Sequence, residues 1–382
     1  MDSRRKIILI GATGSIGANA LRVIEKHADR LELVGIAAHR RFEPLAEIAR
    51  RFSVPHVGLF DADCTPDMGQ LPSGCRFHAG LDGITEMAAG VEADIVLVAS
   101  VGTASLRPTL AAIEAGRSIA LATKEILVMA GAFVMEAARR HGVSIIPVDS
   151  EHNAIYQCLA GAPGRHLRRI VLTASGGAFL DTPLAALADV TPEQALAHPN
   201  WSMGPKITID SATMANKGLE VIEARWLFDL EPAQIDVVIH RQSIVHSMVE
   251  FVDGSFLAQL SPPSMTFAIQ HALLFPERAP GVDRSLDFTT AFSLDFAPLE
   301  PGRFRCLDLA CAALRAGGVA PAVFNAANEV AVDAFVRRAI GFLEIPEVIE
   351  RTMDAIGHPA AATLDDVLAA EVESRAVARR FC

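Results

Sequence analysis

The sequence predicts an α/β fold in three parts. A doubly wound N-terminal domain is expected over residues 1–150, an α+β domain with a mobile flap over 151–274 and, after a linker over 275–300, a helical domain over 301–382. Short β-branched runs alternate with helical patterns in the first part, and strands with few intervening helices dominate the second. Ala/Leu/Val-rich helical periodicity returns after a proline-rich, weakly periodic stretch. With 382 residues, of which 51% are hydrophobic, the chain can bury several cores.

The first domain is predicted from strands at 6–10, 33–37, 56–59, 95–98, 118–121 and 144–148, with helices such as 18–27 and 106–115 between them. Their alternation indicates a parallel sheet. Gly11, Gly14 and Gly17 follow the first strand. Gly11 permits a tight turn, Gly14 removes a side chain where a pyrophosphate must approach, and Gly17 lets the helix pack closely on the strand. The turn predicts a Rossmann-like dinucleotide site, the alternative being an ordinary strand–helix turn.

The end of the second strand indicates which dinucleotide binds. An NAD site would carry an acid there for the ribose 2′-hydroxyl, whereas this chain has His39, Arg40 and Arg41. Cations at this place suit the additional 2′-phosphate of NADP. The alternative is that the arginines only solvate a loop.

The second domain is predicted from strands at 170–174, 235–240, 247–251 and 255–260, with one sheet face exposed. The segment 252–254, Val-Asp-Gly, marks a hairpin and therefore an antiparallel pair. Residues 180–205 lack strong periodicity and contain four prolines, which is typical of a functional loop. We interpret this segment as a lid, with Trp201 as its apolar face and His198 directed at a substrate. The alternative is a buried structural tryptophan.

Two acids follow the strand at 144–148. If the chain stays extended there, Asp149 and Glu151 share a face, and two carboxylates so placed repel unless a cation lies between them. Ligation by oxygen alone favours Mg²⁺ or Mn²⁺ over zinc. The alternative is that Asp149 or Ser150 caps a helix at 152–159.

A third acid belongs to a predicted helix at 216–228. Asn216, Lys217 and Glu220 share one face of it, and the preceding Asp210 is read as part of a polar strand exit. The alternative is a surface Lys–Glu pair. Ser175, at the end of another strand, is followed by two glycines, which makes a turn with open N–H groups suited to an anion.

Composition excludes several function classes. The net charge is −11, from 34 basic and 45 acidic residues, which argues against a general nucleic-acid binder. The six cysteines have no zinc spacing, so free thiols in a reducing cytosol are expected. The basic N-terminus precedes too short an apolar run for a signal peptide, and no transmembrane span is expected. A soluble cytoplasmic protein is predicted, with neither nucleic acid nor membrane as partner.

Taken together, the motifs resemble the 1-deoxy-D-xylulose 5-phosphate reductoisomerase family, in the same order over nearly the whole chain. They lie at residues 11–17, 124–125, 148–153, 174–177, 198–204, 210–220, 240–246 and 324–329. The resemblance implies NADPH-dependent rearrangement and reduction of 1-deoxy-D-xylulose 5-phosphate to 2-C-methyl-D-erythritol 4-phosphate, in the non-mevalonate isoprenoid pathway. It also implies a divalent metal, Mg²⁺ or Mn²⁺ with Co²⁺ as a further option, and a cytoplasmic homodimer.

The resemblance also implies a role for each matched residue. The metal ligands would be Asp149, Glu151 and Glu220. The substrate would contact Ser150, Glu151, Ser175, His198, Ser211, Asn216, Lys217 and Glu220, and its phosphate end would be held by Ser175, Ser211, Asn216 and Lys217. The catalytic residues would be Lys124, Glu151, His198 and Trp201. The cofactor would contact Thr13, Gly14, Ser15, Ile16, Arg40, Arg41, Thr123, Glu125 and Gly204. Trp201 and Met203 would belong to the flap, and His246 would act through the architecture of the substrate site.

The chain departs from the family pattern at a few positions. Thr123 stands where Asn is usual, which puts a contact near the nicotinamide ribose in doubt, and Pro205 stands where a basic residue is more familiar. Two rival functions stay open. Another NADPH oxidoreductase, of the homoserine or semialdehyde dehydrogenase type, would turn over without metal. A non-enzymatic NADP-sensing regulator would be indicated by loss of an acid or of Lys217, and none is lost.

Overall fold

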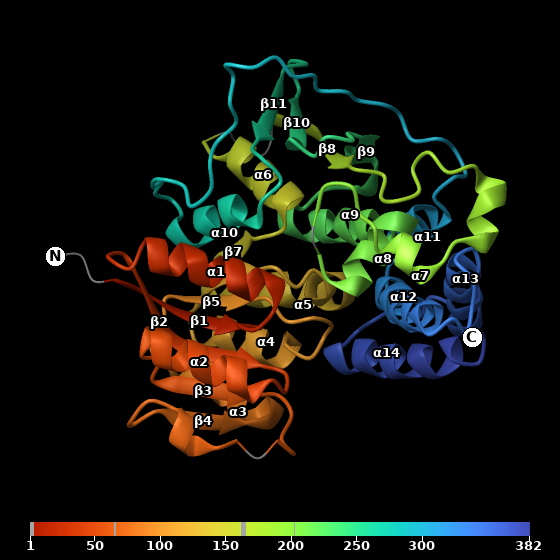
Figure 1. The fold of residues 1–382 in the computed structure, drawn as a ribbon. Helices are drawn as coiled ribbons and strands as arrows, with labels where there is room; N and C mark the ends of the chain where they lie inside the picture. The colour runs from red at the N-terminus through yellow and green to blue at the C-terminus, as the bar shows by residue number, and fades with distance from the viewer. Residues whose placement is uncertain (1–3, 65, 162–165, 202) are drawn as a thin grey trace. The chain divides into compact units, whose positions relative to one another are not determined.

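The computed structural model describes residues 4–64, 66–161, 166–201 and 203–382, and the chain forms two compact units (Figure 1). Unit 1 comprises Met1–Ile126, Phe133–Asn153 and Ser264–Ser285, and unit 2 comprises Leu127–Ala132, Ala154–Pro263 and Leu286–Cys382. The chain passes between the units within helices α5 (Glu125–His141) and α6 (Ser150–Leu159). The three-domain division predicted from the sequence stays a prediction, because compact units and folding domains are different things.

Unit 1 contains a seven-stranded, wholly parallel sheet, which confirms the predicted doubly wound fold. Its order is β4-β3-β2-β1-β5-β6-β7. The strands are β1 (Arg5–Ile10), β2 (Leu31–Ala38), β3 (His56–Leu59), β4 (Arg76–Ala79), β5 (Ile95–Val98), β6 (Ser118–Leu121) and β7 (Ile145–Pro147). All six predicted strands are present. The additional β4 is a four-residue edge strand with only one buried residue, so it lacks the apolar run that would have predicted a strand. The order reverses between β1 and β5, where such sheets bind ligands.

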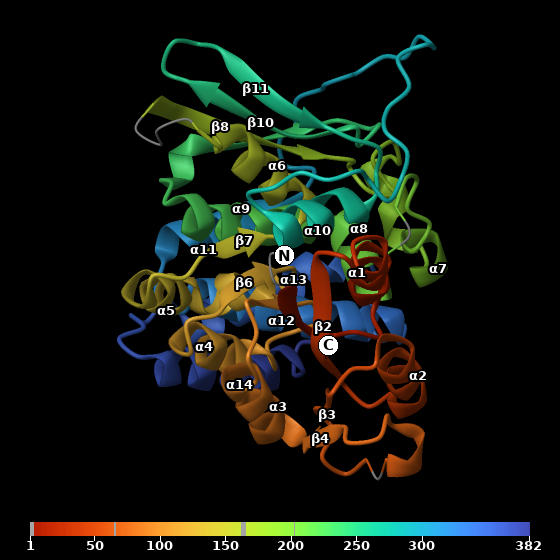
Figure 2. The same ribbon diagram turned by 90° about the vertical axis from the view of Figure 1, so that its left-hand side faces the viewer.

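Helices cover both faces of this sheet. Figure 2 shows α1 (Ser15–Lys26) and α2 (Phe42–Phe52) on one side, and α3 (Gly80–Gly90) and α4 (Leu106–Glu114) on the other. A helix from much later in the chain, α10 (Met265–Leu274), packs against α1. His27 and Gln270 join these two helices through a 3.1 Å side-chain hydrogen bond. Arg5 donates to the carbonyls of Leu273 and Phe275, both at 2.9 Å.

Unit 2 contains a mixed four-stranded sheet in the order β11-β10-β8-β9. Its strands are β8 (Leu167–Ala174), β9 (Ile235–Ile239), β10 (Val245–Phe251) and β11 (Phe256–Leu260). The predicted hairpin is confirmed, since β10 and β11 pair antiparallel and Gly254 has φ +84° in the turn. Strand β11 is an exposed edge, with Phe256 47% and Leu257 50% exposed.

The helices of unit 2 pack together, and most of them contact α12. They are α7 (Pro192–Ala195), α8 (Pro205–Thr213), α9 (Ala215–Phe228), α11 (Arg305–Ala316), α12 (Ala320–Val336), α13 (Glu344–Ile356) and α14 (Leu364–Ala378). Short 3₁₀ turns also occur, at η3 (Leu184–Asp189) and η4 (Pro232–Gln234) in unit 2 and at η1 (Met68–Gln70) in unit 1. Helix α12 is largely enclosed along its length, with Phe324 0% and Phe335 2% exposed. In Figure 1 α12 lies beside α8 and α14, and its contacts with both agree.

One local prediction is wrong. The sequence analysis treats Asp210 as part of a strand exit, yet the segment forms helix α8. Pro205 occupies the first turn, where its fixed φ favours a helix, and Lys206 pairs with Asp210 one turn later at 2.8 Å. These two features favour a helix over a strand. Among the helices that the structure describes, none is long and apolar enough to cross a membrane.

Candidate active site

The glycine-rich turn of unit 1 has the geometry predicted for it. Gly11 has φ +95°, and a Cβ there would lie 2.3 Å from the Ala99 carbonyl oxygen, so no other residue fits. A Cβ on Gly17 would lie 2.4 Å from the Gly11 oxygen, which explains how α1 can start directly against the turn. At Gly14 a Cβ would meet only ordinary contacts, the nearest at 3.4 Å. Protein packing therefore does not require a glycine at position 14, and close approach of a ligand would.

The start of α1 is open to an anion. Its N-cap, Gly14, provides no side-chain cap, and the first turn contains no acid. Free N–H groups and the helix dipole together favour a phosphate at such an end. Beyond β2, Arg41 donates a hydrogen bond to the carbonyl of Thr13, so a guanidinium lies directly beside the turn. Arg40 is exposed next to it. The residues present fit an NADP phosphate end.

The loop after β5 was not predicted as part of the site. It lies where the strand order reverses, and its Val101 is 83% exposed, which is unusual for a large apolar side chain. Thr123 lies beside this loop: its hydroxyl donates to the carbonyl of Ser100 at 2.6 Å and lies 3.3 Å from that of Val98. Thr123 is 2% exposed, so its hydroxyl stabilises the loop through these bonds. In the sequence, the available signal was a Val-Gly pair two residues after the apolar run that forms β5.

Strands β6 and β7 bring Lys124 and Asp149 together. The two strands are neighbours, and at their carboxyl ends the Lys124 ammonium forms an ion pair with the Asp149 carboxylate. The pair is largely enclosed, with side-chain exposures of 6% and 12%. The ammonium balances the charge of the carboxylate in this enclosed place.

The expected extended geometry at Asp149–Glu151 is wrong. Helix α6 starts at Ser150, and the Asp149 carbonyl accepts the first helical bond from Asn153 N–H at 2.8 Å. Asp149 therefore precedes the helix, and Glu151 lies in its first turn, where the dipole favours an acid. Ser150 Oγ donates to Glu151 Oε2 at 2.5 Å. Asp149, Ser150 and Glu151 therefore lie together at the start of helix α6, and not along an extended strand.

In unit 2, Ser175 and His198 lie in direct contact. His198 Nδ1 accepts from the backbone N–H groups of Asn200 and Trp201, at 3.1 and 3.0 Å, so the ring proton is on Nε2. That Nε2–H donates to Ser175 Oγ at 3.0 Å, and Ser175 also accepts from Gly177 N–H at 3.2 Å. With both acceptor positions used, the Ser175 hydroxyl proton is directed to another group. Burial lowers the pKa of His198 and keeps the ring neutral.

The flap segment packs on the second sheet. Trp201 is half-buried and meets the His246 ring edge-on, with 6.2 Å between centroids. His246 is itself held by Ser261 Oγ at 2.9 Å. Asn200 donates to the carbonyl of Arg241 and to Ser243 Oγ. Ser202, within the predicted flap, lies outside the described residues, while Met203 and Gly204 follow it, and Gly204 is the N-cap of α8.

Helices α8 and α9 meet at Met214, whose φ of +61° turns the chain sharply. The start of α9 has no side-chain cap and no acid in its first turn, so it too favours an anion. Asn216 donates to Glu220 Oε1 at 2.6 Å, and the Lys217 ammonium pairs with Glu220 Oε2. Lys217 is 3% and Glu220 0% exposed, which excludes the alternative of a surface pair.

The loop after β8 lies against α8. Gly177 has φ +70°, and a Cβ there would lie 2.5 Å from the carbonyl oxygen of Ser211. Ser175 and Ser211 are therefore carried by two segments in backbone contact. Together with the start of α9, they gather the predicted phosphate-binding residues Ser175, Ser211, Asn216 and Lys217 on neighbouring segments of unit 2.

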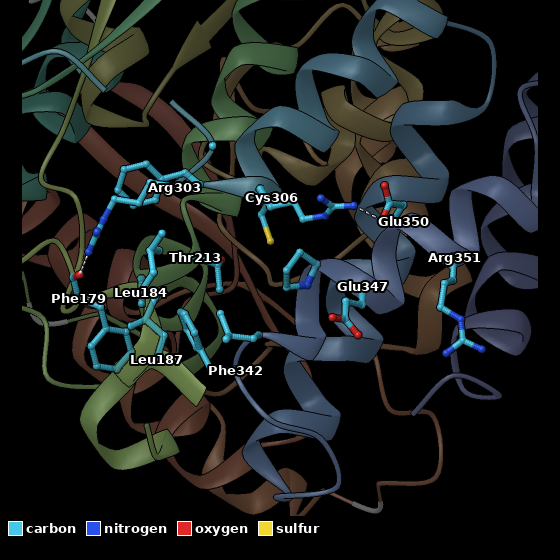
Figure 3. Close-up of a pocket in the computed structure, with 16 residues that line it drawn as sticks. Phe179, Leu184, Leu187, Thr213, Arg303, Cys306, Phe342, Glu347, Glu350 and Arg351 are labelled. Atoms are coloured by element: carbon cyan, nitrogen blue, oxygen red, sulfur yellow. Dashed lines mark hydrogen bonds and ion pairs between the residues drawn. The ribbon is translucent and has the colours of Figure 1, made fainter. Parts of the chain in front are cut away.

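A cavity of about 630 Å³ lies elsewhere in unit 2 (Figure 3). Phe179, Leu187 and Phe342 form its apolar floor, and Ala212 and Thr213 of α8 line it as well. None of the predicted site residues is among the residues that line it. The cavity therefore borders α8 without belonging to the candidate active site.

Three family models match the chain. One described as 1-deoxy-D-xylulose 5-phosphate reductoisomerase matches residues 7–131. One described as the C-terminal domain of 1-deoxy-D-xylulose 5-phosphate reductoisomerase matches residues 145–228, and one described as the DXP reductoisomerase C-terminal domain matches 260–377.

Curated relatives and solved structures match over the full length. The 1-deoxy-D-xylulose 5-phosphate reductoisomerase of Cellvibrio japonicus is 48% identical, covering 100% of this chain and 99% of its own. That of Geobacter metallireducens is also 48% identical, covering 99% of both. The structure of the Zymomonas mobilis enzyme in complex with NADPH aligns with TM-score 0.92 at 43% identity, covering 99% of both chains. A DOX-P reductoisomerase in complex with NADPH, fosmidomycin and magnesium aligns with TM-score 0.91 at 39% identity, covering 99% of this chain and 98% of that one.

Proposed function

The chain belongs to the 1-deoxy-D-xylulose 5-phosphate reductoisomerase family, and we propose that the residues assembled above carry out this family's reaction. The protein is an NADPH-dependent reductoisomerase that converts 1-deoxy-D-xylulose 5-phosphate to 2-C-methyl-D-erythritol 4-phosphate with a divalent metal. The observation that carries this function is the relative that is 48% identical over the whole chain. Neither rival, a different dehydrogenase or a regulator, accounts for a match of this extent.

The metal would be held by Asp149, Glu151 and Glu220. Three carboxylates offer oxygen ligands alone, which suits Mg²⁺ or Mn²⁺. When bound, the ion supplies Lewis acidity, polarising substrate oxygens and stabilising negative charge on them. Lys124 and Lys217 contact two of these acids in the structure and would balance their charge when the ion is absent.

The phosphate end of the substrate would lie on unit 2. Lys217 provides a cation, the α9 N-terminus provides N–H groups, and Ser175, Ser211 and Asn216 provide hydroxyl and amide donors. Ser175 is well prepared for this role, because His198 and Gly177 both donate to its oxygen and leave its hydroxyl proton for the phosphate. His198 thereby links the substrate to the backbone of the flap at Trp201.

The reaction has two stages. The carbon skeleton first rearranges, by retro-aldol cleavage and re-joining, and the resulting aldehyde is then reduced, for which bound NADPH would supply the hydride. Both stages develop negative charge on a substrate oxygen. The Lys124 ammonium, 5% exposed, is a positive donor close to the acids, and Ser150 adds a hydroxyl; together they orient the reacting hydroxyl groups.

The flap excludes water from the cleaved fragments. The phosphate is remote from the reacting carbons, so its binding energy is available for closing the flap. Trp201 packs edge-on against His246 and would bring an apolar surface over the substrate.

The homodimer and the cytoplasmic location are part of this proposal. The exposed apolar side chains of the edge strand β11, Phe256 and Leu257, favour association, because an unpaired edge of this kind is a pairing surface. All six cysteines are free, as a reducing compartment requires. The mass in solution, measured by light scattering, tests the dimer.

NADPH oxidation with 1-deoxy-D-xylulose 5-phosphate tests the function. The enzyme is first treated with a chelator and then assayed with and without Mg²⁺ or Mn²⁺. Oxidation that depends on substrate and on the ion is expected. A folded, NADPH-binding protein that oxidises no NADPH in this assay, or does so equally well without metal, would contradict the proposal and favour a rival dehydrogenase.

A further inference from the structure

Helix α8 contains a carboxylate that the reaction does not use. Asp210 is 1% exposed and immediately precedes Ser211. Its Oδ1 accepts from Asn328 Nδ2 of α12 at 2.8 Å, and its Oδ2 pairs with Lys206 Nζ in the first turn of α8 at 2.8 Å. A buried charge is costly unless it is bonded, so these partners largely define where Asp210 can lie.

We propose that Asn328 is a positioning residue for the phosphate end of the substrate: through Asp210 it fixes α8, and hence Ser211, on the helical core. The inference rests on the proposed role of Ser211 in holding phosphate. Asn328 is 0% exposed and lies in the enclosed helix α12. It belongs to the segment 324–329, one of the motifs on which the family resemblance was based and to which no role was given.

Apolar packing alone does not fix this end of α8. Ala212 and Thr213 line the cavity shown in Figure 3, so the apolar packing around this end of the helix is interrupted by the cavity. A polar tether on another face of the helix therefore has a larger share in setting its position. Figure 1 shows α8 and α12 side by side, as the Asp210–Asn328 bond requires.

A displacement of α8 would reach more than one phosphate ligand. The backbone at Ser211 is so close to Gly177 that a Cβ on the glycine would lie 2.5 Å from the Ser211 oxygen. Gly177 in turn donates to Ser175 Oγ at 3.2 Å. Movement of Ser211 by a few tenths of an ångström therefore disturbs Ser175 as well. Both displacements should weaken substrate binding and leave NADPH binding unchanged.

The chain provides a matched control in Asn325. It lies one turn earlier on α12, is also 0% exposed, and its amide donates at 3.1 Å to Glu329 within the same helix. Asn325→Ala and Asn328→Ala remove the same atoms from the same buried helix. They differ in that only Asn328 donates to α8.

The test compares the KM for 1-deoxy-D-xylulose 5-phosphate, the KM for NADPH and the Tm of the two variants. Asn328→Ala is expected to raise the KM for the substrate by up to about tenfold, the limit reached if the whole energy of one hydrogen bond to a charged group is lost from substrate binding. The KM for NADPH stays unchanged. Asn325→Ala is expected to lower the Tm comparably and to leave both KM values within about twofold. Inhibition by inorganic phosphate, competitive with substrate, should weaken in parallel for Asn328→Ala alone.

A second variant keeps the inference testable if Asn328→Ala does not fold. The exchange Asp210→Asn with Asn328→Asp restores an N–H···O bond between the helices with reversed polarity. The exchange should reverse most of the increase in substrate KM that Asp210→Asn causes alone. Equal substrate KM values in Asn328→Ala and Asn325→Ala, or no recovery in the exchange, would overturn the inference.

Ser211→Ala separates failure of this inference from failure of the proposed function. A raised substrate KM in Ser211→Ala with an unchanged KM in Asn328→Ala overturns the positioning role alone. An unchanged KM in Ser211→Ala removes the phosphate role of Ser211 and overturns the inference with it.

Discussion

Replacing Glu220 by Gln is the sharpest test of the metal site. The side chain keeps its size and its place in α9 but loses its charge. Glu220 is 0% exposed, accepts from Asn216 at 2.6 Å and pairs with Lys217. Removing one member of a buried ion pair costs about 3–5 kcal/mol, because the other charge stays behind in a medium of low polarity. The metal-free variant should therefore be less stable by a few kcal/mol.

The metal effect should be at least as large as the effect on stability. Losing a residue that only supports a ligand lowers metal affinity about 10–100-fold, so losing the ligand itself should reach the upper end of this range. The assay is a Mg²⁺ titration of turnover after chelation, with Tm measured in parallel. We expect the half-saturating Mg²⁺ concentration to rise about 100-fold. An unchanged half-saturating concentration in a folded variant would remove Glu220 from the ligand set.

Glu223→Gln is the matched control. Glu223 lies one turn later on the same helix and is 1% exposed, so its loss also tests a buried acid of α9. We expect little change in Mg²⁺ dependence, because Glu223 is not among the proposed metal ligands. A large shift in Glu223→Gln and none in Glu220→Gln would reverse the assignment.

Three further predictions concern the cofactor and the flap. Arg41→Glu should raise the KM for NADPH about tenfold or more and the KM for NADH far less, because an acid beside Thr13 repels the 2′-phosphate; equal effects on both cofactors would argue that the arginine only supports the turn. Burial lowers the pKa of His198 below 6.5, so the neutral ring that holds the flap turn is fully present above pH 6.5 and is lost as the pH falls toward the lowered pKa. The substrate KM should rise over that range, and His198→Asn should lack this dependence, whereas ionisation of the substrate phosphate acts on both enzymes alike. Trp201→Ala should reduce turnover and substrate affinity while leaving Mg²⁺ binding, measured by calorimetry, intact; normal turnover with normal affinity would remove the tryptophan from closure.

Residues close in sequence could be grouped correctly without a structure. Asn216, Lys217 and Glu220 share a helix face whatever surrounds them, because the spacing alone determines it. The strands of unit 1 were equally accessible, since buried parallel strands are short, continuous apolar runs. Edge strand β4 contains an arginine and a histidine and only one buried residue, so this rule does not apply to it.

Burial decided the alternatives that local patterns left open. A Lys–Glu pair three residues apart is most often a solvated surface feature, and in this chain both members are enclosed by unit 2. The exposure of a side chain depends on every segment packed over it, so no window of the sequence contains the answer. For the same reason the sequence suggested a strand before Asp210. The helix at that place is favoured by Pro205, by Lys206 and by the helical core on which α8 rests.

Distance along the chain also separates what was predicted from what was missed. Asp210 and Asn328 are 118 residues apart, and neither has a charge pattern or spacing that points to the other. The motif at residues 324–329 could be recognised in the sequence, but the role of Asn328 within it could not. Once the 2.8 Å bond is known, the same residues explain why a buried helix of the C-terminal region carries an amide: its donor reaches Asp210, the residue beside the proposed phosphate ligand Ser211. A buried polar group in a helical core destabilises the protein unless it forms a hydrogen bond. The hydrogen-bond partner of such a group therefore indicates what the group is there to position.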